Sequence, residues 1–336
     1  MMFPTRNTLS PTTTQRMSDI LLSTPPQSVS KTATASLFAE VQDLKRIAPA
    51  GTRYSLADNL YVAAWRSVLA GEDWTTIADR TCATAVLYVL FPGIDHRFFR
   101  AAKFSPSQIA EVCNQAFERT IKGRLDTETA ERMRVALKDV INSFVRPTEV
   151  ATETLPEVVE LLRTQPRAGA THPEHPRLVL SPAESHADHC LMTAVYAGLC
   201  AAEYGADPGE AFVCGLAHHL HNAYLPDCGW AGELALEPYL TQVITECRAT
   251  ALTNLPEHLR PRIKHVLRHH ESLATPEGFA ISAGDTLDRV LDVKWRVKAA
   301  AVTDAKVLGD LDLVHPGPLK DFQTNLLNET NLWITS

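Results

Sequence analysis

The sequence predicts an all-α protein. Apolar residues recur at helical spacing on both sides of a Pro- and His-containing stretch near the middle of the chain. Several of these runs begin with Ser, Asp or Pro at the positions that start helices. The 336 residues are 45% hydrophobic and 21% charged, which is enough apolar material for one large or two modest cores. We therefore expect two helical domains.

Residues 1–35 are expected to form a disordered tail. The stretch is rich in Ser, Thr and Pro and poor in apolar residues, so it cannot bury enough surface to offset the entropy lost on folding. A transit peptide is the alternative, because the stretch has few acidic residues and contains Arg6, Arg16 and Lys31. No amphipathic Arg stripe supports that alternative, and the tail is the preferred interpretation.

Residues 36–147 are expected to form an N-terminal helical domain. The segment SLAD begins with Ser55 and resembles a capping box ahead of a helical apolar pattern. In SPSQ, Ser105 precedes Pro106, which suits the first position of a helix. Asp126 can cap a further helix. No motif in this domain indicates a function.

Residues 148–182 are expected to form a linker that contains one short helix near 156–163, because Pro and Gly punctuate the rest of it. Helical spacing resumes in residues 183–336, which we expect to be the second domain. Its last segment predicts a loop followed by a closing helix. Most of the histidines lie in this second domain.

Composition excludes two classes of partner. The formal net charge is −7, and no Lys or Arg cluster is present, so the chain lacks the features of a general nucleic-acid binder. The longest apolar run, CATAVLYVLFPG, stops at Pro92 and is too short for a membrane span. The seven cysteines form no CxxC pair, which favours reduced thiols and a cytoplasmic location.

Histidines gather where predicted helices begin or end. Four segments carry these side chains: SHADHC with His186 and His189, AHHLHN with His218, His219 and His221, KHVLRHH with His265, His269 and His270, and AGDTLD with Asp285. Imidazole and carboxylate groups brought together between helices can bind a divalent ion such as Zn, Fe, Mn, Co or Ni. The sequence therefore predicts a metal pocket between helices.

The order of these segments resembles the HD-domain metal-dependent phosphohydrolases over about 120 residues. SHADHCLMTAVYAG is similar to the first helix of that family, AHHLHNAYLPD to its second signature, HHES to a later His-His-Glu, and AGDTLDRVL to its terminal Asp helix. The resemblance implies an HD-like helical bundle. It also implies that four residues bind the metal: His189, His218, His219 and Asp285.

One departure from the family pattern changes the expected site. The family carries His-Asp where this chain carries His218 and His219. Because an imidazole cannot bridge two metal ions as a carboxylate does, we expect a single ion. A mononuclear site of three His and one Asp would still polarise a bound water.

The resemblance implies a phosphohydrolase that attacks a small phosphorylated metabolite or nucleotide through a metal-bound water. His221 is the expected proton carrier, because an imidazole can exchange protons near pH 7. Arg177 or His270 would offset the charge of the phosphate, Arg177 lying roughly where a nucleotidase-like branch has a phosphate-binding Arg. Two alternatives stay open: a non-catalytic HD-like signalling or scaffold module, and an iron-dependent oxygenase. The oligomeric state is open too, a homo-oligomer included.

Overall fold

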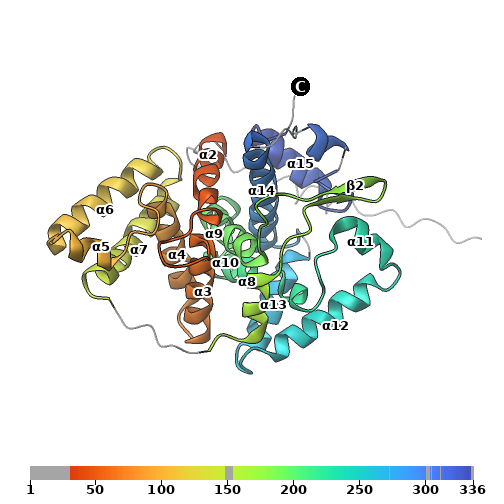
Figure 1. Ribbon diagram of the computed structural model, residues 1–336, viewed down its shortest axis with the longest axis horizontal. Helices are drawn as coiled ribbons and strands as arrows, with labels where there is room; N and C mark the ends of the chain where they lie inside the picture. Colours follow the sequence, from red (N-terminus) through yellow and green to blue (C-terminus); the bar gives the residue numbers. More distant parts are fainter. Residues whose placement is uncertain are drawn as a thin grey trace, which may run out of the picture.

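The computed structural model describes residues 31–147, 154–271, 273–299, 303, 305–310 and 312–333. Within these ranges the chain forms helices and one two-stranded sheet, so the all-α prediction is confirmed (Figure 1). Residues 1–30 of the expected tail lie outside the described ranges. Residues 31–35, which were also assigned to the tail, form the start of the first described helix, with Ala35 buried.

The first part of the chain folds into the expected helices. They are α2 (Lys31–Val41), η1 (Gln42–Lys45), α3 (Leu56–Leu69), α4 (Trp74–Tyr88), α5 (His96–Ala101), α6 (Pro106–Ile121) and α7 (Thr127–Val145). The predicted start signals are confirmed: the side chains of Ser55, Ser105 and Asp126 each accept a hydrogen bond from a backbone N–H of the following first turn.

The expected linker contains more structure than its sequence predicts. Its short helix is α8 (Glu157–Thr164), and residues 148–153 lie outside the described ranges. After α8, the strands β1 (Ala170–His172) and β2 (His175–Leu178) pair antiparallel as a hairpin. The sequence did not predict this hairpin, because a short paired hairpin carries too few residues for a visible alternation of apolar and polar side chains.

The second part of the chain is a set of helices of very different lengths. They are α9 (His186–Tyr204), α10 (Pro208–Ala217), η2 (Leu220–Ala223), α11 (Gly229–Ala235), α12 (Leu240–Thr253), α13 (Arg260–His270), α14 (Pro276–Ala299), η3 (Ala305–Asp310) and α15 (Lys320–Glu329). The expected closing helix is α15, which buries Leu326 and Leu327.

Helix α9 is the centre of the molecule. Its residues 186–201 are all buried, and it packs against α10, α14, α3 and α4, which surround it in Figure 1. The ring of Tyr196 on α9 stacks on Phe38 of α2 at 4.3 Å, and its hydroxyl donates to the Phe38 carbonyl. One apolar core runs from α2 to α15, so the two expected domains share their buried surface.

Two glycines let neighbouring helices approach α9 closely. A Cβ added at Gly215 of α10 would lie 2.5 Å from the Cα of Ala194, and one added at Gly284 of α14 would lie 2.7 Å from the carbonyl oxygen of Thr193. Real side-chain atoms do not approach that closely, so only glycine fits at either position. Each glycine lies within three residues of a predicted metal ligand, and the close packing therefore positions those ligands.

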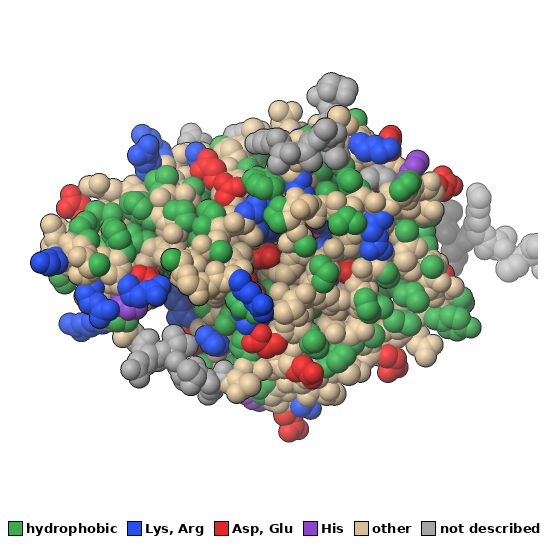
Figure 2. All heavy atoms as spheres, in the orientation of Figure 1, with side chains coloured by type: hydrophobic (Ala, Val, Ile, Leu, Met, Phe, Trp, Pro, Cys, Tyr) green, Lys and Arg blue, Asp and Glu red, His purple; other side chains and the backbone are tan. Residues whose placement is uncertain are grey.

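The face shown in Figure 2 carries both acidic and basic side chains. Among the described residues, no helix has both the length and the apolar character needed to cross a membrane.

Candidate metal centre

Three helices bring His189, His218 and Asp285 together in the interior. His189 lies in the first turn of α9, His218 caps the C-terminal end of α10, and Asp285 lies on α14. The Nε2 atoms of His189 and His218 are 3.2 Å apart, and the Nε2 of His189 is 3.3 Å from Oδ1 of Asp285. Two ligands on one tetrahedral ion, each at about 2.0–2.1 Å, are about 3.4 Å apart. The His189 nitrogen is therefore spaced from each of the other two donor atoms as ligands of one ion would be.

The other nitrogen of each imidazole is held by an acceptor. His189 Nδ1 lies 2.7 Å from Oδ2 of Asp288, and His218 Nδ1 lies 2.7 Å from the Gly215 carbonyl oxygen. In the neutral rings Nδ1 therefore carries the proton, and the Nε2 lone pairs point toward each other and toward Asp285. Metal-binding histidines are oriented in this way by a carboxylate or carbonyl behind the ring.

Burial and neighbouring charges set the protonation of these groups. Burial, together with the adjacent His270, lowers the pKa of His218 well below its usual range, so this ring is neutral. Burial would raise the pKa of Asp285, but Arg289 and His189 hold that pKa well below its usual range. Burial and Arg167 oppose protonation of His189, and the carboxylates of Asp285 and Asp288 outweigh them, so the pKa of His189 is raised. The cluster thus attracts a cation.

His219, the fourth predicted ligand, is beside the cluster but has other partners. Its ring lies 4.2 Å from that of His218 and 5.0 Å from that of His189, centroid to centroid. One nitrogen from each of these three histidines can be chosen so that all lie within 4.8 Å of one another. However, His219 Nε2 accepts a hydrogen bond from Arg167 at 3.0 Å, and its Nδ1 donates to Asn222. His219 can join a metal site only if it loses the Arg167 contact.

Two further carboxylates near His189, those of Glu184 and Asp288, already form ion pairs with a lysine. Glu184, His189 and Asp288 also place ligand atoms close together. The ammonium of Lys45, from η1, forms ion pairs with both carboxylates, and its side chain is only 3% exposed. Because the lysine neutralises this group, we assign Asp288 to orienting His189 rather than to binding a metal.

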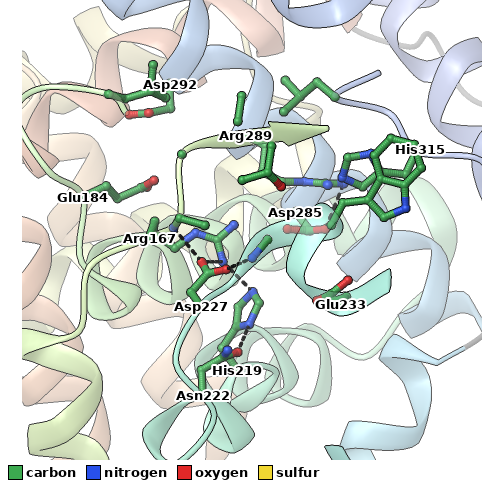
Figure 3. Close-up of a pocket in the computed structure, with 18 of the residues that line it drawn as sticks. Arg167, Glu184, His219, Asn222, Asp227, Glu233, Asp285, Arg289, Asp292 and His315 are labelled. Carbon is green, nitrogen blue, oxygen red and sulfur yellow. Dashed lines mark hydrogen bonds and ion pairs between the residues drawn. The ribbon is translucent and has the colours of Figure 1, made fainter. Parts of the chain in front are cut away.

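A cavity of about 230 Å³ opens beside the cluster (Figure 3). In the view of Figure 3, His219 lies beside Asp227 and Asp285 lies beside Glu233, and all four line the cavity. Two guanidinium groups reach it: Arg167 from the segment before β1, and Arg289 from α14, which pairs with Asp285 at 3.2 Å. The cavity thus combines candidate metal ligands with two guanidinium groups, and the carboxylates of Glu184, Asp227, Glu233 and Asp292 line it too.

The structure separates the three residues predicted to be catalytic. His221 and His270 line the cavity, and burial lowers both pKa values, that of His221 to about 4. His270 is therefore neutral and cannot offset charge as a cation. Arg177 lies on β2, is exposed, and donates to the Cys228 carbonyl oxygen instead of lining the cavity. Arg167, ten residues earlier in the chain, lies where Arg177 was expected.

Sequence reasoning missed four residues that shape the site: Arg167, Asp227, Asp288 and Arg289. Asp288 and Arg289 follow Asp285 by three and four residues on α14. That spacing places all three on one helix face, which was the available signal. Arg167 and Asp227 carry no such signal, because only the fold brings them together.

No protein-family model matches the chain, and no curated protein and no solved structure is significantly similar to it.

Proposed function

We propose that this chain is a metal-dependent phosphohydrolase of HD type that acts on a small phosphorylated metabolite or nucleotide. The observation that carries the proposal is that His189 Nε2 lies 3.2 Å from His218 Nε2 and 3.3 Å from Asp285 Oδ1, beside a cavity lined by two guanidinium groups. The order of the histidine and aspartate segments along the chain, which resembles the HD family, supports it.

The donor set fits one divalent ion. His189, His218 and Asp285 would hold it, and the mixture of imidazole and carboxylate suits Zn, Fe, Mn, Co or Ni. A bound ion would polarise a phosphoryl oxygen and lower the pKa of water. The proposal needs no second ion, because Lys45 already neutralises the neighbouring carboxylates of Glu184 and Asp288.

Arg167 and Arg289 are the groups that would bind the phosphate. Guanidinium groups match the geometry of phosphate oxygens and stay charged at all relevant pH values. Arg167 is anchored by His219, 3.0 Å away, and by Asp227, 3.7 Å away. Arg289 is anchored by Asp285. These anchors fix both guanidinium groups before the substrate binds, which lowers the entropy cost of binding.

His221 and His270 would contact the substrate or the attacking water. Both line the cavity, and each neutral ring offers one N–H donor and one acceptor. His221 Nδ1 is buried without a hydrogen-bond partner in the described part of the chain, so it is available to a bound molecule. We keep His221 as the proposed proton carrier.

The size of the cavity limits the substrate. A volume of about 230 Å³ is below the roughly 300–1,000 Å³ of typical ligand pockets. Trp230 and His315 stack on each other at 4.6 Å and form part of the lining. We infer that the phosphate and a small adjoining group enter the cavity.

A screen for phosphate release tests the proposal. The full chain, loaded in turn with each of the five metals, would be incubated with small phosphomonoesters and nucleoside monophosphates. We expect metal-dependent release by the wild type and by Asp321→Ala, a control that removes an exposed carboxylate from α15, and none by Asp285→Ala. Bound metal with no release from any ester would favour the non-catalytic module. Oxygen consumption by the iron-loaded protein would favour the oxygenase.

A further inference from the structure

A second cluster of ligand-type side chains lies away from the cavity, between α10 and α13. Glu210 is in the first turn of α10, and His265 and His269 are four residues apart on α13. One nitrogen from each imidazole and one carboxylate oxygen lie within 4.8 Å of one another. None of the three residues lines the cavity described above.

The geometry points to a second divalent-metal site formed by Glu210, His265 and His269. Histidines at positions i and i+4 of a helix project from the same face and can chelate one ion. Glu210, from the neighbouring helix, supplies a third ligand of a type that Zn²⁺ accepts. The inference does not depend on the proposed phosphohydrolase activity.

The environment of His269 carries the inference furthest. Its side chain is 10% exposed, and its Nδ1 lies 2.9 Å from the Thr275 hydroxyl and 3.9 Å from Oε2 of Glu277. Nε2 lies 3.3 Å from Glu210 Oε2, so a proton or a metal ion on Nε2 would face that carboxylate. Nε2 has no hydrogen-bond partner among the described residues. Two electron-rich atoms facing each other at this distance are stabilised by a cation between them.

His265 completes the site from the solvent side. The residue is exposed, and its ring lies 5.5 Å from that of His269, centroid to centroid. Its Nδ1 now accepts a hydrogen bond from Arg268, an exposed residue of the same helix. A metal bound by either nitrogen of His265 would displace that contact. Arg268 therefore competes with the metal, and removing it should strengthen binding.

A metal at this position would join helices that also carry the candidate centre. It would link the start of α10, whose end carries His218, to α13, whose end carries His270. Thr275, behind His269, immediately precedes α14. An ion that binds only the folded chain stabilises it. We therefore assign the second site a structural role in holding these helices together.

Zinc content per chain tests the inference. Untagged full-length protein would be loaded with Zn²⁺, desalted and subjected to elemental analysis as wild type, His265→Ala, Asp285→Ala and the double variant. We expect His265→Ala to carry one ion fewer than the wild type, and the double variant to carry one ion fewer than Asp285→Ala. His258→Ala, which removes another exposed histidine near α13, should match the wild type. Equal zinc in wild type and His265→Ala would overturn the inference.

Two further measurements, the melting temperature and the zinc affinity, test the second site without an activity assay. Zn²⁺ should raise the melting temperature of Asp285→Ala, and this shift should be absent when His265→Ala is added. Arg268→Ala should bind zinc more tightly than the wild type in a chelator competition, and weaker binding would contradict the assignment.

The same measurements separate the two proposed sites. If the candidate centre on α9, α10 and α14 fails to bind metal, Asp285→Ala will carry as much zinc as the wild type, while His265→Ala will still carry one ion fewer.

Discussion

The Nε2 atoms of His189 and His218 face each other at 3.2 Å inside the protein, each with its Nδ1 held from behind. Such a pair has no internal proton donor when both rings are neutral, and Asp285 adds a third electron-rich atom beside it. A buried set of lone pairs is costly unless a cation lies between them, either the proton that the raised pKa of His189 favours or a metal ion in its place. The account of the site follows from this relationship.

The glycines that let α10 and α14 approach α9 should not tolerate a side chain. Gly215→Ala places a Cβ 2.5 Å from Ala194, so the backbones must separate. We expect a loss of about 1–3 kcal/mol in the free energy of unfolding, together with weaker metal binding. Urea denaturation measures the first effect. Gly317→Ala is the control, because nothing lies within 4 Å of its added Cβ. Equal stability of the two variants would contradict the packing described here.

Lys45→Met should be strongly destabilising. Lys45 carries the buried positive charge that pairs with Glu184 and Asp288, and its removal leaves Glu184 without this ion pair and Asp288 with only its His189 and Gln42 contacts. Breaking a buried ion pair from one side costs about 3–5 kcal/mol. Chemical denaturation measures the loss. The matched control is Lys31→Met, whose pairs with Glu203 and Glu329 are on the surface and should contribute about 0–1 kcal/mol. Similar losses in the free energy of unfolding of both variants would contradict this prediction.

Arg167→Ala should weaken phosphate binding. The variant removes one of the two guanidinium groups that reach the cavity. A hydrogen bond to a charged group contributes about 1.5–3 kcal/mol, so we expect the inhibition constant of inorganic phosphate to rise by about 10–100-fold. Arg177→Ala, which removes an exposed guanidinium from β2, should change it little. A larger effect for Arg177→Ala would contradict this assignment and would support Arg177, the residue expected from the sequence, as the phosphate-binding arginine.

The seven cysteines should divide into two groups by reactivity. Five are buried, whereas Cys228 and Cys247 are half-buried. Burial raises the pKa of Cys113 to about 11 and that of Cys214 to about 12, so these thiols form little thiolate. We expect a thiol reagent at neutral pH to label only Cys228 and Cys247 in the folded protein, and all seven after denaturation. Rapid labelling of Cys214 would show that α10 is less well packed than described.

Local signals in the sequence predicted the helices and part of the site. The starts of three helices could be predicted from their N-cap residues, Ser55, Ser105 and Asp126, because capping involves residues close together in the chain. His189, His218 and Asp285 were proposed as ligands because the order of their segments along the chain resembles the HD family.

Features that depend on long-range contacts could not be predicted. Lys45 lies more than 130 residues from either of its partners, and no local pattern connects them. Arg167 lies in a segment that reads as a linker, and Arg177, in the same segment, has the same chemistry. Only the pairing of β1 with β2 and the contact with His219 separate the two arginines.

Metal content tests the central claim most directly. The protein would be purified without added metal as His265→Ala, which removes the second cluster, and as His265→Ala with Asp285→Ala, and both would undergo elemental analysis. The account predicts close to one divalent ion per chain in the first protein and a large loss in the second. Equal, negligible metal in both would contradict it.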